Sequence, residues 1–199
     1  MAIVVEHEKR RYEILERALD IFVEEGYEDA TFQKIADRCG ITRTTLYLYF
    51  KNKREIFVWS IKQLTDGVEK YLREVMANDS LTYAERLERV MFTILDRCTE
   101  NRKLFNVVLT YLLQVQKTGK DPDSRVKRRT IRLRHLLSQI IIAGKSAGAF
   151  RDCNVKDANE LFYGMVESAI FRIAILDRES SEDVKQAISL AIQGLSIST

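Results

Sequence analysis

The chain has 199 residues, of which 46% are hydrophobic and 31% charged, with 8 glycines and 1 proline. This composition suits a globular protein of one or two domains and excludes a wholly disordered chain or a collagen-like fibre. The longest internal stretch without a charge, residues 104–116, has 13 residues, and a membrane span needs about 20. The apolar residues 2–5 are too few for a signal peptide. We therefore expect a cytoplasmic protein with no membrane partner.

The residues that enzymes and metal sites need are scarce. Cys39, Cys98 and Cys153 are far apart and form no Cys-x-x-Cys pair, so we expect thiols packed in the interior, with a redox sensor as the alternative. The two histidines belong to no Glu-x-x-His motif, and the chain has no Gly-rich phosphate loop. We predict no catalytic residue, no metal and no cofactor.

Apolar residues recur every three or four positions along the whole chain, which predicts an all-α fold of about nine helices. Gly26 and Gly40 are expected to end helices, and Asn154 to begin one. Residues 52–55 and 82–85 are typical of capping boxes. Residues 101–117 are apolar on nearly all sides, which predicts burial among other helices. The predicted helices span residues 9–25, 31–38, 42–49, 52–77, 82–99, 101–117, 122–143, 154–176 and 180–195.

Residues 31–50 combine two short helices with a turn, the pattern of a helix-turn-helix unit. Ala36 is small enough for the two helices to cross closely, and Gly40 can adopt the positive φ of the turn. The second helix of such a unit lies in the major groove of DNA. The predicted shared core holds Ile35, Ile41 and Leu46, and the predicted outer face holds Thr42, Arg43, Thr44, Thr45 and Tyr47.

Charge favours the same interpretation. Residues 30–54 hold six basic residues and one acid, Asp37, a balance of 6 − 1 = +5, although the whole chain carries only +3. A local positive surface suits a phosphate backbone. Two alternatives remain: a plain helical hairpin, and an interaction module that binds a protein without specific DNA binding.

The motifs Ile35-Ala36, Gly40-Ile41-Thr42, Leu46-Tyr47, Tyr49-Phe50 and Asn52-Lys53 resemble the DNA-binding domain of the TetR family of transcriptional regulators. The resemblance implies a homodimer that binds a double-stranded DNA operator and represses transcription until a small molecule enters the larger domain. An activator of the same family is the alternative. The implied domains are a helix-turn-helix domain, residues 1–51, and a ligand-binding and dimerisation domain, residues 52–199, connected by the helix 52–77.

The resemblance also implies roles for single residues. Thr31, Thr42 and Tyr49 match phosphate-contacting positions, and Lys53 matches a lysine that anchors the DNA backbone. Arg43 matches a base-reading position, where it could bind a guanine, and Tyr47 matches a base or phosphate contact. Thr44 departs from the small residue common in the family, which puts the operator sequence in doubt.

The remaining helices supply candidates for effector binding and for dimerisation. For each of the aromatic candidates we favour ordinary core packing over ligand binding, and for Arg172 we favour an ion pair with an acid over contact with an anionic ligand. We interpret the basic run 125–134 as a solvated helix face. The ligand candidates are Trp59, Phe92, Phe105, Tyr111, Phe162, Tyr163 and Arg172. The dimer candidates, on apolar stripes of the last two helices, are Met165, Ala169, Ile173, Leu176, Ile188, Ala191 and Leu195.

Overall fold

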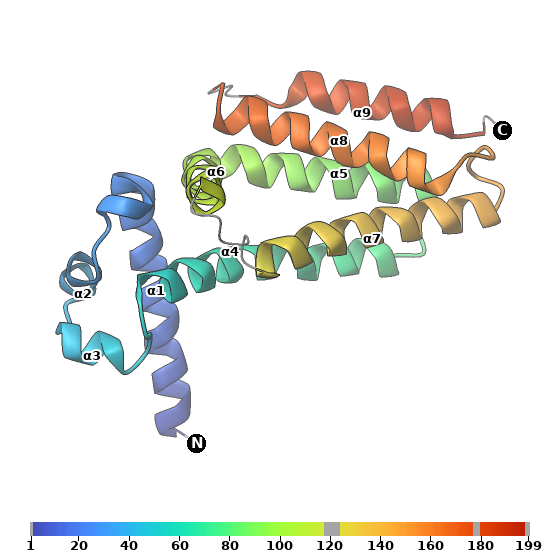
Figure 1. The fold of residues 1–199 in the computed structure, drawn as a ribbon. Coiled ribbons are helices and arrows are strands. Elements are labelled where there is room, and N and C mark those ends of the chain that lie inside the picture. The colour runs from blue at the N-terminus through green and yellow to red at the C-terminus, as the bar shows by residue number, and fades with distance from the viewer. Residues whose placement is uncertain (1, 118–123, 177–179, 198–199) are drawn as a thin grey trace. The chain divides into compact units, whose positions relative to one another are not determined.

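The computed structural model describes the backbone of residues 2–117, 124–176 and 180–197, and the side chains of the same residues except 2–5, 64–65 and 124–130. These residues form nine helices and no strand, which confirms the predicted all-α fold (Figure 1). The helices are α1 (Ala2–Asp29), α2 (Phe32–Cys39), α3 (Arg43–Tyr47), α4 (Lys53–Ala77), α5 (Tyr83–Glu100), α6 (Arg102–Lys117), α7 (Ser124–Ser146), α8 (Val155–Ala174) and α9 (Glu182–Leu195).

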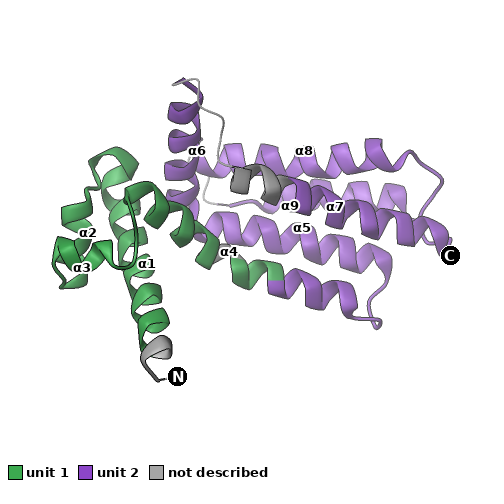
Figure 2. Ribbon diagram, turned by 60° about the horizontal axis from the view of Figure 1, so that its bottom comes forward, with its two compact units in different colours: residues 1–69 green, residues 70–199 purple. Residues whose placement is uncertain are grey.

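The chain divides into two compact units, residues 1–69 and residues 70–199, which are green and purple in Figure 2. The division by packing falls within α4. The sequence-based boundary between residues 51 and 52 remains a prediction about function.

The core of the first unit joins α1 to the two short helices and to the start of α4. Ile14 and Ala18 of α1 are fully buried, as are Ile35 and Ala36 of α2 and Leu46 of α3. Burial of an isoleucine or leucine side chain stabilises a fold by roughly 1.5–3 kcal/mol. The α2–α3 pair is therefore held on α1 by the shared core that the sequence predicts.

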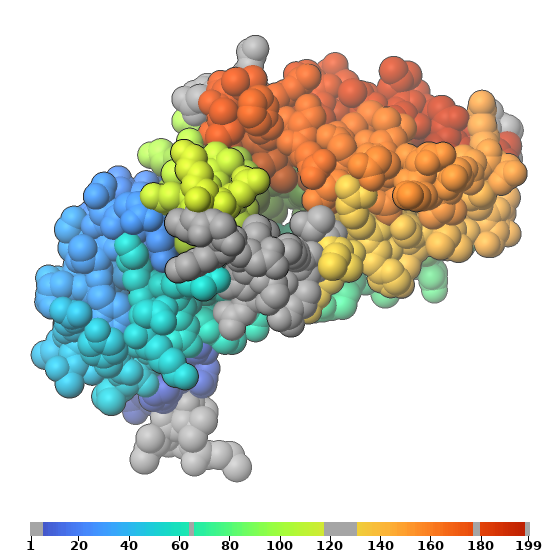
Figure 3. Space-filling view, in the orientation of Figure 1, coloured from blue at the N-terminus to red at the C-terminus, as the bar shows by residue number. Residues whose placement is uncertain are grey.

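The second unit is a bundle around α5, which packs against α7, α8 and α9. Leu87, Met91 and Leu95 of α5 are fully buried, and so is Ile188 of α9. Helices α8 and α9, orange and red in Figure 3, lie side by side. None of the described helices combines the length and apolar character needed to cross a membrane.

Local capping signals place the helix starts correctly. The Thr82 and Glu85 side chains form the predicted capping box, and Asn154 caps α8. At α4 the box is altered: the Glu55 backbone N–H donates to Asn52, but the Glu55 carboxylate accepts from the Lys51 N–H instead of the Asn52 N–H. The Asn52 side chain therefore still caps α4, but the backbone N–H that Glu55 binds in return belongs to Lys51.

Two expectations about unit 2 are wrong. Helix α6 is buried only along Leu104, Val107 and Tyr111, and Leu113 is 57% exposed, because α6 packs chiefly on α8. Helix α7 continues past Gly144 to Ser146, and Gly144 leaves room for an aromatic ring, since a Cβ there would lie 2.3 Å from the Phe150 side chain. The predicted start of this helix at residue 122 lies outside the described residues.

Candidate nucleic-acid interface

Hydrogen bonds and backbone conformation at Thr31 and Gly40 set the two ends of helix α2. The Thr31 hydroxyl accepts a hydrogen bond from the Lys34 N–H at 3.2 Å, which caps the helix. Gly40 ends the helix in the left-handed region, at φ 65°, and the Ile41 N–H returns to the Ala36 carbonyl at 3.0 Å. The chain thereby reverses within a few residues and presents α3.

Helix α3 has one buried side and one exposed side. The Thr42 hydroxyl caps it by accepting from the Thr45 N–H at 3.0 Å, and the two hydroxyl oxygens lie 2.8 Å apart. Leu46 is fully buried, whereas the side chains of Arg43 and Thr44 are exposed and that of Thr45 is half-buried. Hydroxyl and guanidinium groups thus gather on the outer side, as the sequence predicts.

Arg43 and Tyr47, one turn apart, hold each other. The Arg43 guanidinium donates to the Tyr47 hydroxyl at 3.2 Å, and its carbon lies 5.7 Å from the ring centroid. The Tyr47 ring also packs on Phe32 of α2, with centroids 4.6 Å apart, although the side chain is 50% exposed. Tyr47 therefore both packs between the helices and fixes the position of Arg43.

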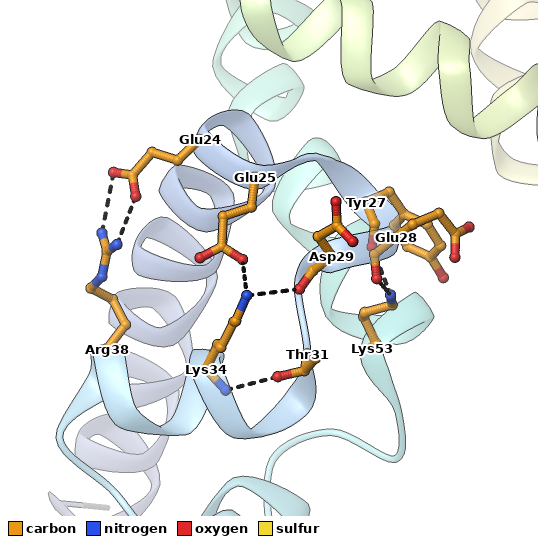
Figure 4. Close-up of polar contacts among 9 residues, drawn as sticks. All are labelled: Glu24, Glu25, Tyr27, Glu28, Asp29, Thr31, Lys34, Arg38 and Lys53. Carbon is orange, nitrogen blue, oxygen red and sulfur yellow. Dashed lines mark hydrogen bonds and ion pairs between the residues drawn. The ribbon is translucent and has the colours of Figure 1, made fainter.

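Lys53 contacts the end of α1, and the DNA-backbone contact that the resemblance implies for it stays a prediction. Its ammonium donates to the main-chain carbonyls of Tyr27 at 2.6 Å and Glu28 at 3.0 Å, and lies 4.4 Å from the Tyr27 ring centroid. These carbonyls end α1 just after Gly26, whose φ of 83° breaks the helix where the sequence predicts. Figure 4 shows Lys53 directed at this end of α1.

The positive surface is smaller than the charge count suggests. Lys34 pairs with Glu25 at 2.7 Å, and Arg38 pairs with Glu24 at 2.6 Å (Figure 4). The hydrogen bond from Arg38 lowers the pKa of the Glu24 carboxyl. Two of the six charges between residues 30 and 54 are therefore neutralised by acids of α1, which lie outside the segment that was counted.

Two residues near this surface were not predicted. The His7 imidazole stacks on the Tyr49 ring with centroids 4.5 Å apart, since α1 already begins at Ala2. The Arg11 guanidinium lies over the rings of Phe50 and Trp59. Both contacts join segments about 40 residues apart in sequence, which no local pattern reveals.

The ligand candidates are divided between the two units. Trp59 belongs to the first unit, where it is half-buried, and Tyr111, Phe162 and Tyr163 are buried in the second unit. Phe105 is half-buried on α6. Arg172 is exposed and pairs with Asp183 of α9 at 2.8 Å, the kind of contact that the sequence favours for it.

Phe92 lines an open surface groove of about 330 Å³ between α5 and α9. Lys185 lies in this groove, 5.4 Å from the Phe92 ring centroid, and pairs with Asp96 at 2.5 Å. The other lining residues, Leu190 apart, are polar: Glu182, Gln186, Ser189 and Gln193. An apolar effector would gain little from such a lining.

The dimer candidates divide by burial. Ala169, Ile173 and Ile188 are at most 2% exposed inside their own chain, so they have no surface to offer a partner. Met165, Ala191 and Leu195 are half-buried, and Leu176 is exposed. The exposed large apolar residues on and just after α8 and α9 include the candidate Leu176 and five residues that were not predicted: Leu161, Phe171, Ile175, Leu190 and Ile197.

Cysteine chemistry gives no site among the described residues. Cys39 and Cys98 are buried, and burial raises the pKa of the Cys98 thiol to about 12. A thiol with so high a pKa is a poor nucleophile and metal ligand. In the described ranges, no group of three or more His, Cys, Asp or Glu side chains is arranged to hold a metal.

Comparison with known families gives two matches along the chain. The model for bacterial regulatory proteins of the tetR family matches residues 14–58, which include α2 and α3. The model for the tetracyclin repressor-like C-terminal domain matches residues 80–170. Together the two models cover more than half of the chain.

Single relatives agree with these models. The chain is 21% identical over 160 residues to the fatty acid metabolism regulator protein of Bacillus subtilis, which covers 79% of this chain and 80% of that protein. It is 30% identical over 69 residues to the HTH-type transcriptional activator FasR of Mycolicibacterium smegmatis, which covers 35% of this chain and only 32% of that protein.

A solved structure shares the fold. The crystal structure of a TetR transcription regulator from Haloarcula marismortui aligns with a TM-score of 0.83 and 21% identity, covering 96% of this chain and 100% of that one. At this identity the likeness concerns the fold.

Proposed function

The chain belongs to the TetR family of DNA-binding transcription regulators, and from this membership we propose that it is a repressor. It binds an operator of two half-sites as a homodimer and releases the DNA when a small molecule binds the second unit. The observation that carries the proposal is the exposed side of α3, where Arg43, Thr44 and Tyr47 stand on a helix whose buried side holds Leu46. Such a helix is suited to the major groove.

We assign each residue a contact with a base or with a phosphate from the hydrogen-bonding groups of its side chain and from the family resemblance. Arg43 reads a guanine through two parallel hydrogen bonds, and Thr44 and Thr45 contact neighbouring base edges or a thymine methyl. Tyr47 aims Arg43 through its hydroxyl. Thr31 and Thr42 contact phosphate, since hydroxyl groups at helix N-termini favour an anion. Tyr49 contacts phosphate through its hydroxyl, the role that the family resemblance implies for it. Lys53, already bonded to two carbonyls, is assigned the positioning of α1 on α4.

The dimer forms through α8 and α9. On α8, Leu161 and Phe171 are 52% and 53% exposed, which is unusual for side chains of this size. On α9, the small residues Ala187 and Gly194 are also exposed, so a partner helix can approach closely. An apolar face with small residues is suited to a two-fold contact between identical helices.

The effector is assigned to the class of fatty acyl compounds. The relative that matches the chain over most of both lengths is named a fatty acid metabolism regulator. Helices α6 and α8, which carry Phe105, Tyr111 and Phe162, provide apolar walls for such a chain. These residues also pack in the core. The two roles are compatible, because apolar side chains that pack together in the free protein can move apart to admit an acyl chain.

The proposal is tested with DNA selected from a random pool, followed by titration of the selected sequence at two salt concentrations. A two-fold symmetric site and a steep salt dependence are expected, since every phosphate contact releases counterions. Acyl-CoA thioesters of increasing chain length are then added to the complex, and release of DNA is expected at one range of lengths. If the folded protein selects no DNA sequence, the proposal is contradicted. Binding to a protein partner with an affinity that does not depend on salt would support an interaction module instead.

A further inference from the structure

The first turns of α1 place two side chains against the aromatic residues that follow α3. The His7 imidazole stacks on Tyr49 with ring planes 21° apart. The Arg11 guanidinium carbon lies 4.4 Å from the Trp59 ring centroid and 5.1 Å from that of Phe50. His7 and Arg11 are four residues apart, so they share one face of the helix.

The guanidinium group of Arg11 has different partners from those of the neighbouring arginines. Arg10 donates to Glu13 at 2.9 Å and to the Cys39 carbonyl at 3.1 Å, and Arg17 donates to the Arg38 carbonyl at 3.0 Å. Those two arginines thus tie the end of α2 to α1. Arg11 makes only its aromatic contacts with the described residues, and it forms no ion pair there with Glu8, three residues earlier.

A guanidinium held in this way is prepared for an anion. Its stem and its planar face are fixed by two rings, so little freedom is lost when its N–H groups bind. The fork of N–H groups matches two oxygens of a phosphate. The His7 ring N–H and the Tyr49 hydroxyl, which belong to two stacked rings, are further hydrogen-bond donors.

We propose that His7, Arg11 and Tyr49 form a second contact with the DNA backbone, outside the α2–α3 unit. The inference rests on the proposed function, since its ligand is a phosphate of duplex DNA beside the bases that α3 reads. Tyr49 links the two surfaces, because it follows the end of α3 at Tyr47 by two residues and its ring lies on His7. The role of Arg11 is thus to fix the register of the protein on the operator.

The test compares Arg11→Met with Lys9→Met in the full-length protein on the selected operator. Methionine keeps an apolar stem over Trp59 and Phe50 and removes the charge. Lys9 is exposed and lies on a different face of α1 from Arg11, and its replacement by methionine removes the same single positive charge. We expect Arg11→Met to weaken binding about five- to ten-fold at 0.1 M salt and to reduce the salt slope by about 0.9, the value of one phosphate contact.

Lys9→Met should leave both quantities close to the wild type, and Arg11→Lys should restore most of the slope. Thermal unfolding of each variant shows whether the fold is intact. Equal effects of Arg11→Met and Lys9→Met would overturn the inference, because the loss would then be a long-range charge effect. If the wild type selects no operator, the proposed function fails; if it binds and Arg11→Met changes nothing, only this inference fails.

A second pair of variants tests whether the residues share one phosphate. Tyr49→Phe removes the hydroxyl and keeps the ring on His7. Combined with Arg11→Met, it should weaken binding by less than the product of the two single effects, because residues that share a partner are not additive. Strictly multiplicative losses would overturn the shared contact.

Discussion

Lys53 donates a 2.6 Å hydrogen bond to the main-chain carbonyl of Tyr27 and so joins the first turn of α4 to the end of α1. Its second bond goes to the Glu28 carbonyl, while Lys34 of α2 donates to the Asp29 carbonyl at 3.2 Å. The last carbonyls of a helix have no partner within it and carry partial negative charge. Two ammonium groups from two other helices therefore cap α1 and hold α2 and α4 on it (Figure 4).

Replacement of Lys53 by methionine should destabilise the protein by about 1–2 kcal/mol, because the Tyr27 and Glu28 carbonyls lose a charged donor. Chemical denaturation of wild type and variant measures this loss. The salt slope of operator binding should stay unchanged if Lys53 only positions α1. A slope reduced by about 0.9 with unchanged stability would show that Lys53 contacts phosphate instead.

Replacement of Arg43 by alanine should weaken binding to the operator by about 1–3 kcal/mol and relax the preference at one base pair. Tyr47→Phe removes the hydroxyl that holds Arg43 and keeps the ring on Phe32. It should relax the same base pair to a smaller extent. Titrations against operators with each single base change measure both effects, and a uniform loss on all sequences would make Arg43 a phosphate contact.

Signals carried by neighbouring residues were sufficient to predict much of the first unit. Gly26 and Gly40 end helices because their positive φ is accessible without a Cβ, and Thr31 and Thr42 cap helices through bonds three residues away. The partners of Lys53, Arg38 and Arg11 were not predictable in this way. Each lies 14 or more residues distant along the chain, and only the packing of α1 against α2 and α4 brings them together.

For the dimer candidates, the spacing of apolar residues does not distinguish a face buried within the chain from a face that binds a partner. An apolar stripe on α8 correctly indicates a buried face, but Ala169 and Ile173 are buried by helices of their own chain. The exposed set around Phe171 and Leu190 lies at other helical positions, where the periodic pattern is weak. The sequence therefore indicates that α8 and α9 are amphipathic, and the structure identifies which of their residues are available to a partner.

The ion pair between Glu24 and Arg38 predicts a pH dependence of stability. The hydrogen bond from Arg38 holds the pKa of the Glu24 carboxyl below its usual value, so the folded state favours the ionised carboxylate. The stabilisation is present above the unfolded-state pKa and is lost as pH falls through the lower folded-state pKa. Glu24→Gln should therefore destabilise the protein at pH 7 and have no effect well below pH 4.5.

Thermal unfolding of the wild type and of Glu24→Gln across this pH range measures the difference. Both groups are exposed, so the effect should be small and should shrink further at high salt. Glu16→Gln on the same helix is the matched control, since no ion pair of Glu16 is found among the described side chains. A difference between wild type and Glu24→Gln that persisted unchanged into acid would exclude the ion pair as its cause.

Disruption of the exposed α8–α9 face should separate the two protomers. Phe171→Glu places a charge where an apolar contact is proposed, so the molecular mass in solution should fall from that of a dimer to that of a monomer. Operator binding should then lose its two-fold character, because each monomer holds one half-site with about half of the phosphate contacts and a correspondingly smaller salt slope. Ile142→Glu on α7 is the control, since Ile142 is 51% exposed and Phe171 is 53% exposed. Sedimentation equilibrium at several concentrations distinguishes the outcomes, and a dimer unaffected by Phe171→Glu but dissociated by Ile142→Glu would move the interface to α7.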